Sequence, residues 1–144
     1  MDTNIKIMVV LQKLSMAFNN QLGQNINDLG LTTSEFTIMA HLNAVDREKT
    51  QRLGEVAFIT SGTITYTVTK LVEKGYVRKQ QDEEDKRVYW VELTEKGAAF
   101  YTSVFTAHKK FLDAIFGQFS EDEKLAFIEQ MKYFGKKIES YDER

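Results

Sequence analysis

Short hydroxyl side chains recur in the stretch Thr60–Lys74, TSGTITYTVTKLVEK, at a spacing that places most of them on one face of a helix. Hydroxyl groups and the methyl group of threonine can reach base edges in the major groove of DNA. Threonine is a mediocre helix former, so its use on an outward face indicates a function beyond solvation. We predict that this face reads DNA bases through Ser61, Thr63, Thr65 and Tyr66. The alternative is an ordinary amphipathic helix with a threonine-rich exposed face.

Basic and polar residues on either side of these hydroxyl groups are suited to contact the DNA backbone. The cations Lys70, Lys74, Arg78 and Lys79 run from the predicted helix into the next segment, where only Glu73 opposes them. Contacts with phosphates position a protein on the duplex without specifying its sequence. The predicted backbone contacts are Gln51, Arg52, Thr69, Lys70, Lys74 and Arg78.

A charged turn, Asp82–Arg87 (DEEDKR), connects two segments predicted as strands, Tyr76–Gln80 and Val88–Leu93. A guanidinium group at the tip of such a hairpin can enter the narrow, negative minor groove beside a binding site. The residues that we predict to act in this wing are Asp85, Lys86 and Arg87, with Asp85 orienting Arg87 by a charge-assisted hydrogen bond. The alternative is a merely solvated turn, as charge runs usually are.

The elements that must position these groups form a helix–turn–helix. In the predicted second helix of this motif, an inner face is expected from Ile64, Val68, Leu71 and Val72, and Gly75 is expected to end the helix. The preceding short helix is expected to begin at Thr50 as N-cap and to pack through Leu53, Val56 and Ala57, after a loop formed by DREK at 46–49. A wing that directly follows a helix–turn–helix predicts a winged helix.

Long helices are predicted at both ends of the chain. The first runs from about Asn4 to Asp28 and stops near Gly30. A capping box at Thr32–Glu35 opens the second helix, with Phe36, Met39, Ala40 and Leu42 inward. Thr94 is expected to cap a helix that ends near Gly117, and Ser120 with Glu123 to open a last helix that ends near Tyr141.

Aromatic residues are concentrated in the C-terminal part of the chain. Seven of the ten phenylalanines follow residue 95: Phe100, Phe105, Phe111, Phe116, Phe119, Phe127 and Phe134. This apolar surface exceeds what a small winged core can cover, so we expect both terminal regions to form a homodimer. The alternative is a monomeric helical subdomain that closes on itself.

Composition excludes several classes of site. The chain has no cysteine, which excludes disulfides, thiol catalysis and cysteine-based zinc sites. The two histidines, His41 and His108, are far apart in sequence, and no nucleophile–base pair, phosphate loop or dinucleotide fingerprint is present. We therefore expect no enzymatic activity, no metal and no cofactor. No signal peptide or run of about 18 apolar residues is found, so we expect a cytoplasmic protein without a membrane partner.

The pattern from LTTSEFTIMAHL to VELTEKG resembles the MarR family of bacterial winged-helix transcription regulators over the whole chain. The residues that carry the resemblance are Thr63-Ile64-Thr65, Leu71 with Lys74-Gly75, Asp82 with Asp85 and Arg87, and Leu93–Gly97. The resemblance implies a mainly α fold with a small β wing, a homodimer, double-stranded DNA with a palindromic operator as partner, repression, and often release by a small aromatic or phenolic ligand. It also implies a single MarR-like domain, 1–144, with dimerisation helices at 1–29 and 95–144 and a winged DNA-binding core at 32–93.

One departure from the family concerns the tip of the wing. Many members carry a second basic residue there, whereas this chain has Glu83 and Glu84. Three functions stay open at this point: a ligand-responsive DNA-binding repressor, a winged-helix module that binds protein, and an enzyme of unrecognised chemistry. The polar threonine face and Arg87 favour the repressor, because protein-binding winged helices tend to expose apolar patches there.

Overall fold

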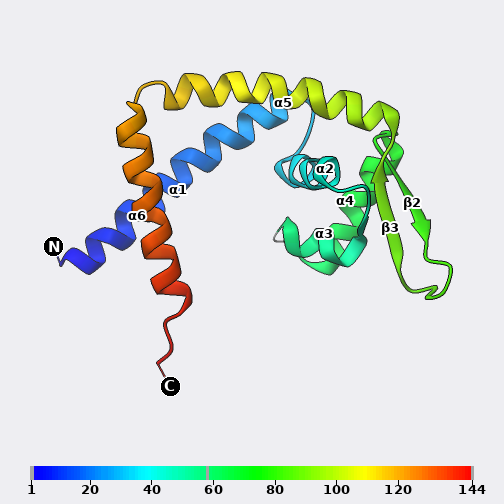
Figure 1. The fold of residues 1–144 in the computed structure, drawn as a ribbon, viewed down its shortest axis with the longest axis horizontal. Helices are drawn as coiled ribbons and strands as arrows, with labels where there is room; N and C mark the ends of the chain where they lie inside the picture. Colours follow the sequence, from blue (N-terminus) through cyan, green and yellow to red (C-terminus); the bar gives the residue numbers. More distant parts are fainter. Residues whose placement is uncertain (1, 58, 144) are drawn as a thin grey trace. The chain divides into compact units, whose positions relative to one another are not determined.

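The computed structural model describes residues 2–57 and 59–143 (Figure 1). Within these residues the chain forms six α-helices and three β-strands, which confirms the predicted mainly α fold with a small β wing. The elements are α1 (Thr3–Asp28), α2 (Thr33–Ala44), β1 (Glu48–Lys49), α3 (Thr50–Val56), α4 (Ser61–Glu73), β2 (Val77–Gln81), β3 (Tyr89–Leu93), α5 (Glu95–Phe116) and α6 (Glu121–Glu139). The chain divides into two compact units, Met1–His108 and Lys109–Arg144. No helix in the described ranges is long and apolar enough to cross a membrane.

The ends of the helices follow the predicted capping residues. In α2 the Thr32 side chain accepts from the Glu35 N–H at 3.1 Å, and the Glu35 carboxylate accepts from the Thr32 N–H at 2.9 Å. The same reciprocal capping box opens α6 at Ser120 and Glu123. After α1 the backbone turns at Gly30, where φ is +95°, a conformation that favours glycine.

The sheet has three antiparallel strands in the order β1-β3-β2. Strand β1 corrects the prediction of a loop at 46–49, because Glu48 pairs with Val91 and Lys49 with Trp90. A strand of two residues shows no alternation, so its sequence resembles a loop. Thr50 is not the N-cap of α3, as was predicted, but its first residue, and its hydroxyl group donates to the Tyr89 carbonyl at 3.2 Å.

Helix α4 packs on the core of the first unit through Ile64, Thr67, Val68 and Leu71. The prediction that Val72 points inward is wrong, since its side chain is 40% exposed. Thr67 lies on the buried face, and its hydroxyl group donates to the Thr63 carbonyl at 2.8 Å. That bond satisfies its polar group and leaves its methyl group to pack against the core. The surrounding core consists of Ile26, Leu31, Ile38, Met39, Leu42, Leu53, Val77, Val91, Tyr101 and Val104.

The second unit contains the C-terminal end of α5 and all of α6. None of the described residues of α6 is buried, although the helix carries large apolar side chains. Residues spaced by three and four positions, Phe127, Ile128, Met131, Phe134 and Ile138, form an apolar stripe along it, and each is more than 40% exposed.

Candidate nucleic-acid interface

The four residues predicted to read bases lie exposed on the N-terminal half of α4. Ser61, Thr63, Thr65 and Tyr66 are all exposed, and Tyr66 is 64% exposed. Thr60 caps the helix by accepting from the Thr63 N–H at 3.4 Å. The helix therefore begins with short polar side chains at its outer surface, while the opposite face is fixed in the core.

The hydroxyl groups of this face are not equivalent. Thr65 Oγ1 donates to the Ser61 carbonyl at 3.1 Å, and Thr69 Oγ1 donates to the Thr65 carbonyl at 2.8 Å. Thr63 Oγ1 instead pairs with another hydroxyl group, Thr60 Oγ1, at 3.1 Å. The face thus offers different hydrogen-bonding groups at positions that carry the same residue type.

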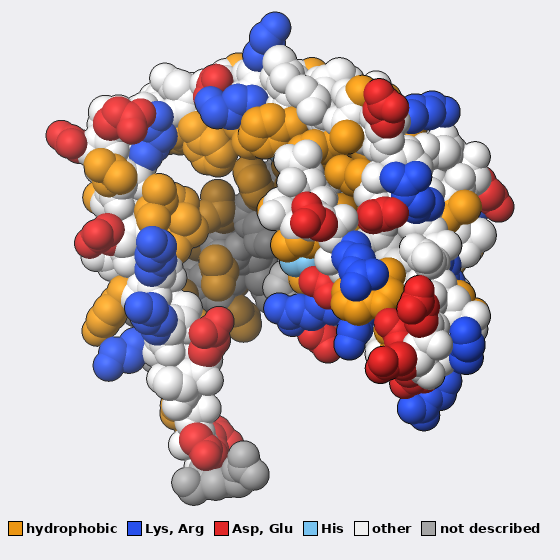
Figure 2. All heavy atoms as spheres, turned by 45° about the vertical axis from the view of Figure 1, so that its right-hand side comes forward, with side chains coloured by type: hydrophobic (Ala, Val, Ile, Leu, Met, Phe, Trp, Pro, Cys, Tyr) orange, Lys and Arg blue, Asp and Glu red, His pale blue; other side chains and the backbone are white. Residues whose placement is uncertain are grey.

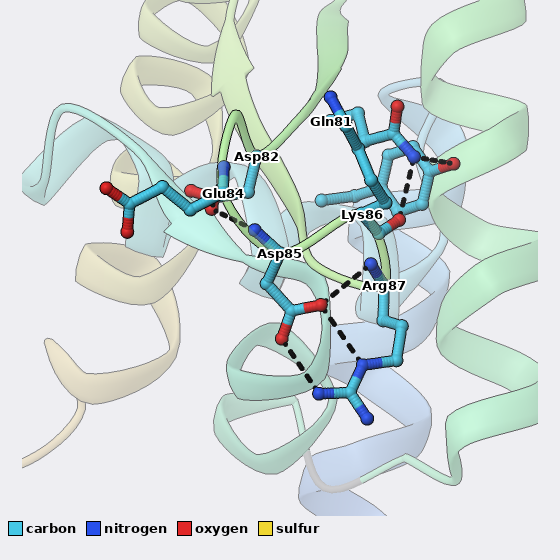
Figure 3. Close-up of polar contacts among 7 residues, drawn as sticks. Gln81, Asp82, Glu84, Asp85, Lys86 and Arg87 are labelled. Atoms are coloured by element: carbon cyan, nitrogen blue, oxygen red, sulfur yellow. Dashed lines mark hydrogen bonds and ion pairs between the residues drawn. The ribbon is translucent and has the colours of Figure 1, made fainter.

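The wing holds Arg87 against Asp85 (Figure 3). Asp85 Oδ1 accepts from Arg87 Nε and Asp85 Oδ2 accepts from Arg87 Nη2, each at 3.1 Å. The Arg87 side chain nevertheless stays 91% exposed. Its hydrogen bonds lower the pKa of Asp85 below the ordinary value, which keeps this carboxylate charged. The pair therefore presents a guanidinium group in a fixed orientation at the surface of the wing.

A second aspartate organises the rest of the turn. Asp82 Oδ2 accepts from the Asp85 N–H at 3.0 Å and the Glu84 N–H at 3.1 Å, and Asp82 Oδ1 accepts from Trp90 Nε1 at 2.8 Å. These bonds, that from the Asp85 N–H first, lower the pKa of Asp82. The Arg47 guanidinium lies 4.0 Å from the centroid of the Trp90 ring. Two of the four acidic residues at 82–85 thus serve the structure of the wing.

A hollow of about 240 Å³ lies between the start of α3, helix α4 and the wing. Its lining brings together four residues named as candidates from the sequence, Gln51, Thr65, Lys79 and Arg87, with Thr50, Val88, Tyr89 and one further cation, Lys49. The prediction of site residues did not include Lys49, because its place beside the wing depends on the pairing of β1 with β3. Three cations around one hollow suit a phosphate group.

The other predicted backbone residues carry their own carboxylate partners. Arg52 pairs with Glu55 at 2.7 Å, Lys70 with Glu73 at 3.3 Å, and Arg78 with Glu92 at 2.6 Å. All three pairs are exposed, so water screens them and a phosphate can replace the carboxylate at low cost. In Figure 2 the Lys and Arg side chains of the winged part are accordingly interspersed with Asp and Glu. Lys86 is exposed on the wing, and its carbonyl accepts from Gln81 Nε2 at 2.7 Å (Figure 3).

Lys74 differs from these cations because its partner is buried. Its Nζ donates to Glu35 Oε2 at 2.7 Å, and the Glu35 side chain is 4% exposed. Its carbonyl accepts from Lys96 Nζ at 2.9 Å. Lys74 therefore joins the C-terminal end of α4 to α2, and a contact between Lys74 and phosphate stays a prediction.

The chain leaves α4 through a tight junction with α5. Gly75 has φ of +81°, and its carbonyl accepts from Thr94 Oγ1 at 2.6 Å. Thr94 Oγ1 in turn accepts from the Gly97 N–H at 3.0 Å, as expected of a helix cap. Gly97 lies against the backbone of Tyr76, so closely that a Cβ atom would overlap the Tyr76 carbonyl. This junction fixes the start of α5 on the winged unit, which is the first compact unit, Met1–His108.

The two histidines take part in separate contacts. His41 Nε2 lies 3.0 Å from Glu48 Oε2, and His108 Nδ1 lies 2.8 Å from Asn25 Oδ1. Burial lowers the pKa of His108. Over residues 2–57 and 59–143, the structure places no three His, Asp or Glu side chains where they could hold a metal ion together.

The sequence of the chain is similar to those of known transcription regulators. A family model described as a winged helix DNA-binding domain matches residues 31–97. The chain is 28% identical to the HTH-type transcriptional regulator MhqR of Bacillus subtilis (strain 168) over 134 residues, which cover 93% of this chain and 92% of MhqR. It is 30% identical to the HTH-type transcriptional regulator SarZ of Staphylococcus haemolyticus over 105 residues, which cover 72% of this chain and 69% of SarZ.

A solved structure with the same fold has been determined with DNA. This is a mutant MarR from E. coli complexed with operator DNA, with a TM-score of 0.77 and 20% sequence identity. The match covers 94% of this chain and 95% of that chain. At this identity the likeness shows that the two chains share a fold.

Proposed function

The chain belongs to the MarR family of winged-helix transcription regulators, and from that premise we propose that it represses transcription as a homodimer on a palindromic operator and is released by a small aromatic ligand. Membership of a family of transcription regulators also confirms that it is not an enzyme. The observation that carries the proposal is the exposed polar face of α4 beside a hollow lined by Lys49, Lys79 and Arg87.

Base reading is assigned to the start of α4 and positioning to the surrounding cations. The first residues of a recognition helix meet base edges in helix–turn–helix proteins, which fits the exposure of Ser61, Thr63, Thr65 and Tyr66. Positioning falls to Gln51, Arg52, Thr69, Lys70, Lys74 and Arg78, and minor-groove contact to Asp85, Lys86 and Arg87 in the wing. The core at 32–93 is thereby proposed as the DNA-binding part.

Dimerisation is assigned to the terminal regions, 1–29 and 95–144, because each exposes apolar surface. Helix α6 carries the stripe Phe127, Ile128, Met131, Phe134 and Ile138, and Figure 2 shows hydrophobic side chains exposed along it at the left of the view. Helix α1 exposes Ile7, Leu11 and Leu14 at helical spacing, and among its described residues only Ile26 is buried. Such extended apolar surface is typical of an interface between subunits.

Release by a small aromatic ligand is proposed from the resemblance to the MarR family. The first unit contains an aromatic cluster, in which the Phe36 ring lies 5.8 Å from the buried Tyr101 and 5.2 Å from the buried His108, centroid to centroid, and which supports a site for a ring if the core opens. A ligand releases DNA only if it binds more tightly to the form whose recognition helices do not fit the grooves.

The test of DNA binding is a selection from random duplexes followed by fluorescence anisotropy. The wild type should enrich a palindrome and bind it far more tightly than random DNA. Arg87→Ala should weaken binding most where A·T-rich sequence flanks the half-sites, because the minor groove is narrowest there. Lys137→Ala removes the same charge from α6 and should leave affinity unchanged. Failure to enrich any sequence would refute DNA recognition.

The dimer and the ligand have separate tests. Phe134→Glu places a charge in the α6 stripe and should shift the protein to monomer in sedimentation equilibrium, whereas Lys132→Glu on the same helix should not. A dimer that persists with Phe134→Glu would contradict the assignment of α6. Phenolic acids at millimolar concentration should reduce operator binding by the wild type, and an aromatic screen without any effect would leave a regulator controlled by its own concentration.

A further inference from the structure

Two threonines on the exposed face of α4 have already used their hydroxyl protons. Thr65 donates to the Ser61 carbonyl at 3.1 Å and Thr69 donates to the Thr65 carbonyl at 2.8 Å. A hydroxyl group has one proton and two lone pairs. Both residues are exposed, so each presents to the outside a hydrogen-bond acceptor and a methyl group, but no donor.

Thr63, two residues earlier, has the opposite arrangement. Its Oγ1 is paired at 3.1 Å with Thr60 Oγ1, a hydroxyl group that can itself donate, so the Thr63 proton can be given to an acceptor outside the protein. The same helix therefore carries one threonine that can donate to a base and another, Thr65, that cannot donate without breaking a helical hydrogen bond.

Base pairs differ in what they offer to such side chains in the major groove. An A·T pair presents the thymine methyl group and the adenine amine, which is a donor. A G·C pair offers the cytosine amine and the two acceptors of guanine, but no methyl group. A side-chain methyl group can therefore pack against the thymine methyl group of an A·T pair, a contact that a G·C pair does not offer.

We propose that Thr65 selects an A·T base pair in each half-site by packing its methyl group against the thymine methyl group, while Thr63 reads a neighbouring base as a donor. This inference rests on the proposed binding of α4 in the major groove. Helical threonine divides between two rotamers, but the rotation that would let Thr65 donate to a base would break its bond to the Ser61 carbonyl. The preference is thus a property of the folded helix, in addition to the residue type.

The experiment uses full-length protein and the palindrome enriched from random duplexes. Thymines are replaced by deoxyuridine, one symmetric pair at a time, which removes only the methyl group. One such pair should weaken wild-type binding by roughly fourfold per half-site, about 15-fold for the palindrome, as expected for one buried methyl group per half-site. Thr65→Ser lacks the methyl group and keeps the hydroxyl, so it should bind thymine DNA with a similar loss and show no further loss on deoxyuridine DNA.

The matched variants separate methyl contact from hydrogen bonding. Thr65→Val keeps a methyl group and removes the hydroxyl, so it should stay within about twofold of wild type, because the proposed contact with thymine is made by the methyl group. Thr63→Val should lose roughly fivefold per half-site through the missing donor, whereas Thr63→Ser should retain binding. All four substitutions lie at two exposed positions, and circular dichroism checks that each variant is folded.

Several results would overturn the inference while leaving DNA binding intact. One is an equal loss on deoxyuridine DNA for wild type and Thr65→Ser, and another is a loss for Thr65→Val as large as that for Thr65→Ser. The inference would also be overturned if no thymine lay at the base pairs where substitution of Thr65 changes the sequence preference. If the wild type enriched no sequence, the proposed function itself would fail, and this outcome is visible before any variant is made.

Discussion

Replacing Lys74 by methionine should destabilise the winged unit, because it removes the counter-charge of a buried carboxylate. Glu35 is 4% exposed at its side chain and accepts from Lys74 Nζ at 2.7 Å and from the Thr32 N–H at 2.9 Å. Removal of one partner from a fully buried pair costs about 3–5 kcal/mol. Lys74 is 38% exposed, so water can replace part of its contact. We therefore expect a loss of about 2 kcal/mol in the free energy of unfolding.

The assay is urea unfolding at one fixed protein concentration, followed by circular dichroism. Lys70→Met is the matched control, because Lys70 lies on the same helix and its pair with Glu73 is exposed at both ends. It should change the free energy of unfolding by less than about 0.5 kcal/mol. In a double-mutant cycle, Glu35→Gln should make Lys74→Met much less costly, because the uncompensated charge is then absent.

Two results would decide the role of Lys74. If Lys74→Met and Lys70→Met had equal stability, the reasoning about the buried pair would be refuted. A salt titration of operator binding reports separately on phosphate contact, since each lost contact reduces the slope of log K against log salt by about 0.9, or nearly twice that per dimer. Lys74→Ala with an unchanged slope would remove Lys74 from the predicted backbone contacts.

Other perturbations have equally direct readouts. Gly97→Ala should destabilise the chain by more than about 2 kcal/mol in urea unfolding, because its Cβ would overlap the Tyr76 backbone, whereas Gly62→Ala, with open space around it, should not. Burial lowers the pKa of His108 below its ordinary 6.5, so the unfolded chain binds more protons. Stability should therefore fall as the pH drops below about 6.5 and be independent of this group above it, and unfolding at pH 7.5 and 5.5 should show a smaller difference for His108→Gln. Diamide should leave operator affinity unchanged because the chain has no cysteine, and a loss reversed by dithiothreitol would contradict this.

Local chemistry made much of the fold predictable. The capping boxes at Thr32–Glu35 and Ser120–Glu123 each join residues three positions apart, so their sequence contains the whole interaction. Gly75 ends α4 for a similarly local reason, because its φ of +81° favours glycine. The predicted wing turn also contains both partners of the Asp85–Arg87 pair.

Contacts between distant residues could not be predicted in the same way. Lys74 meets Glu35 across 39 positions, so spacing within α4 left it among the predicted phosphate contacts without any sign of a buried partner. Strand β1 forms through its pairing with β3, which is distant in the sequence. The same pairing positions Lys49 in the lining of the hollow. Val72 was predicted on the inner face because hydrophobicity ranks valine as an inner residue, but its side chain is 40% exposed, whereas Thr67, for which no face was predicted, is buried.

The internal ion pairs of the winged part limit the attraction of such a regulator to DNA of arbitrary sequence. Arg52, Lys70, Arg78 and Arg87 each already contact a carboxylate, and the chain has a net charge of −2. A phosphate therefore exchanges with a carboxylate at each of these cations, and although the exchange costs little, each contact also adds little to the affinity for arbitrary duplex DNA. Because nonspecific DNA exceeds operator DNA by orders of magnitude in a cell, weak attraction to it leaves more of the regulator free. Occupancy of the operator then responds to a small number of molecules.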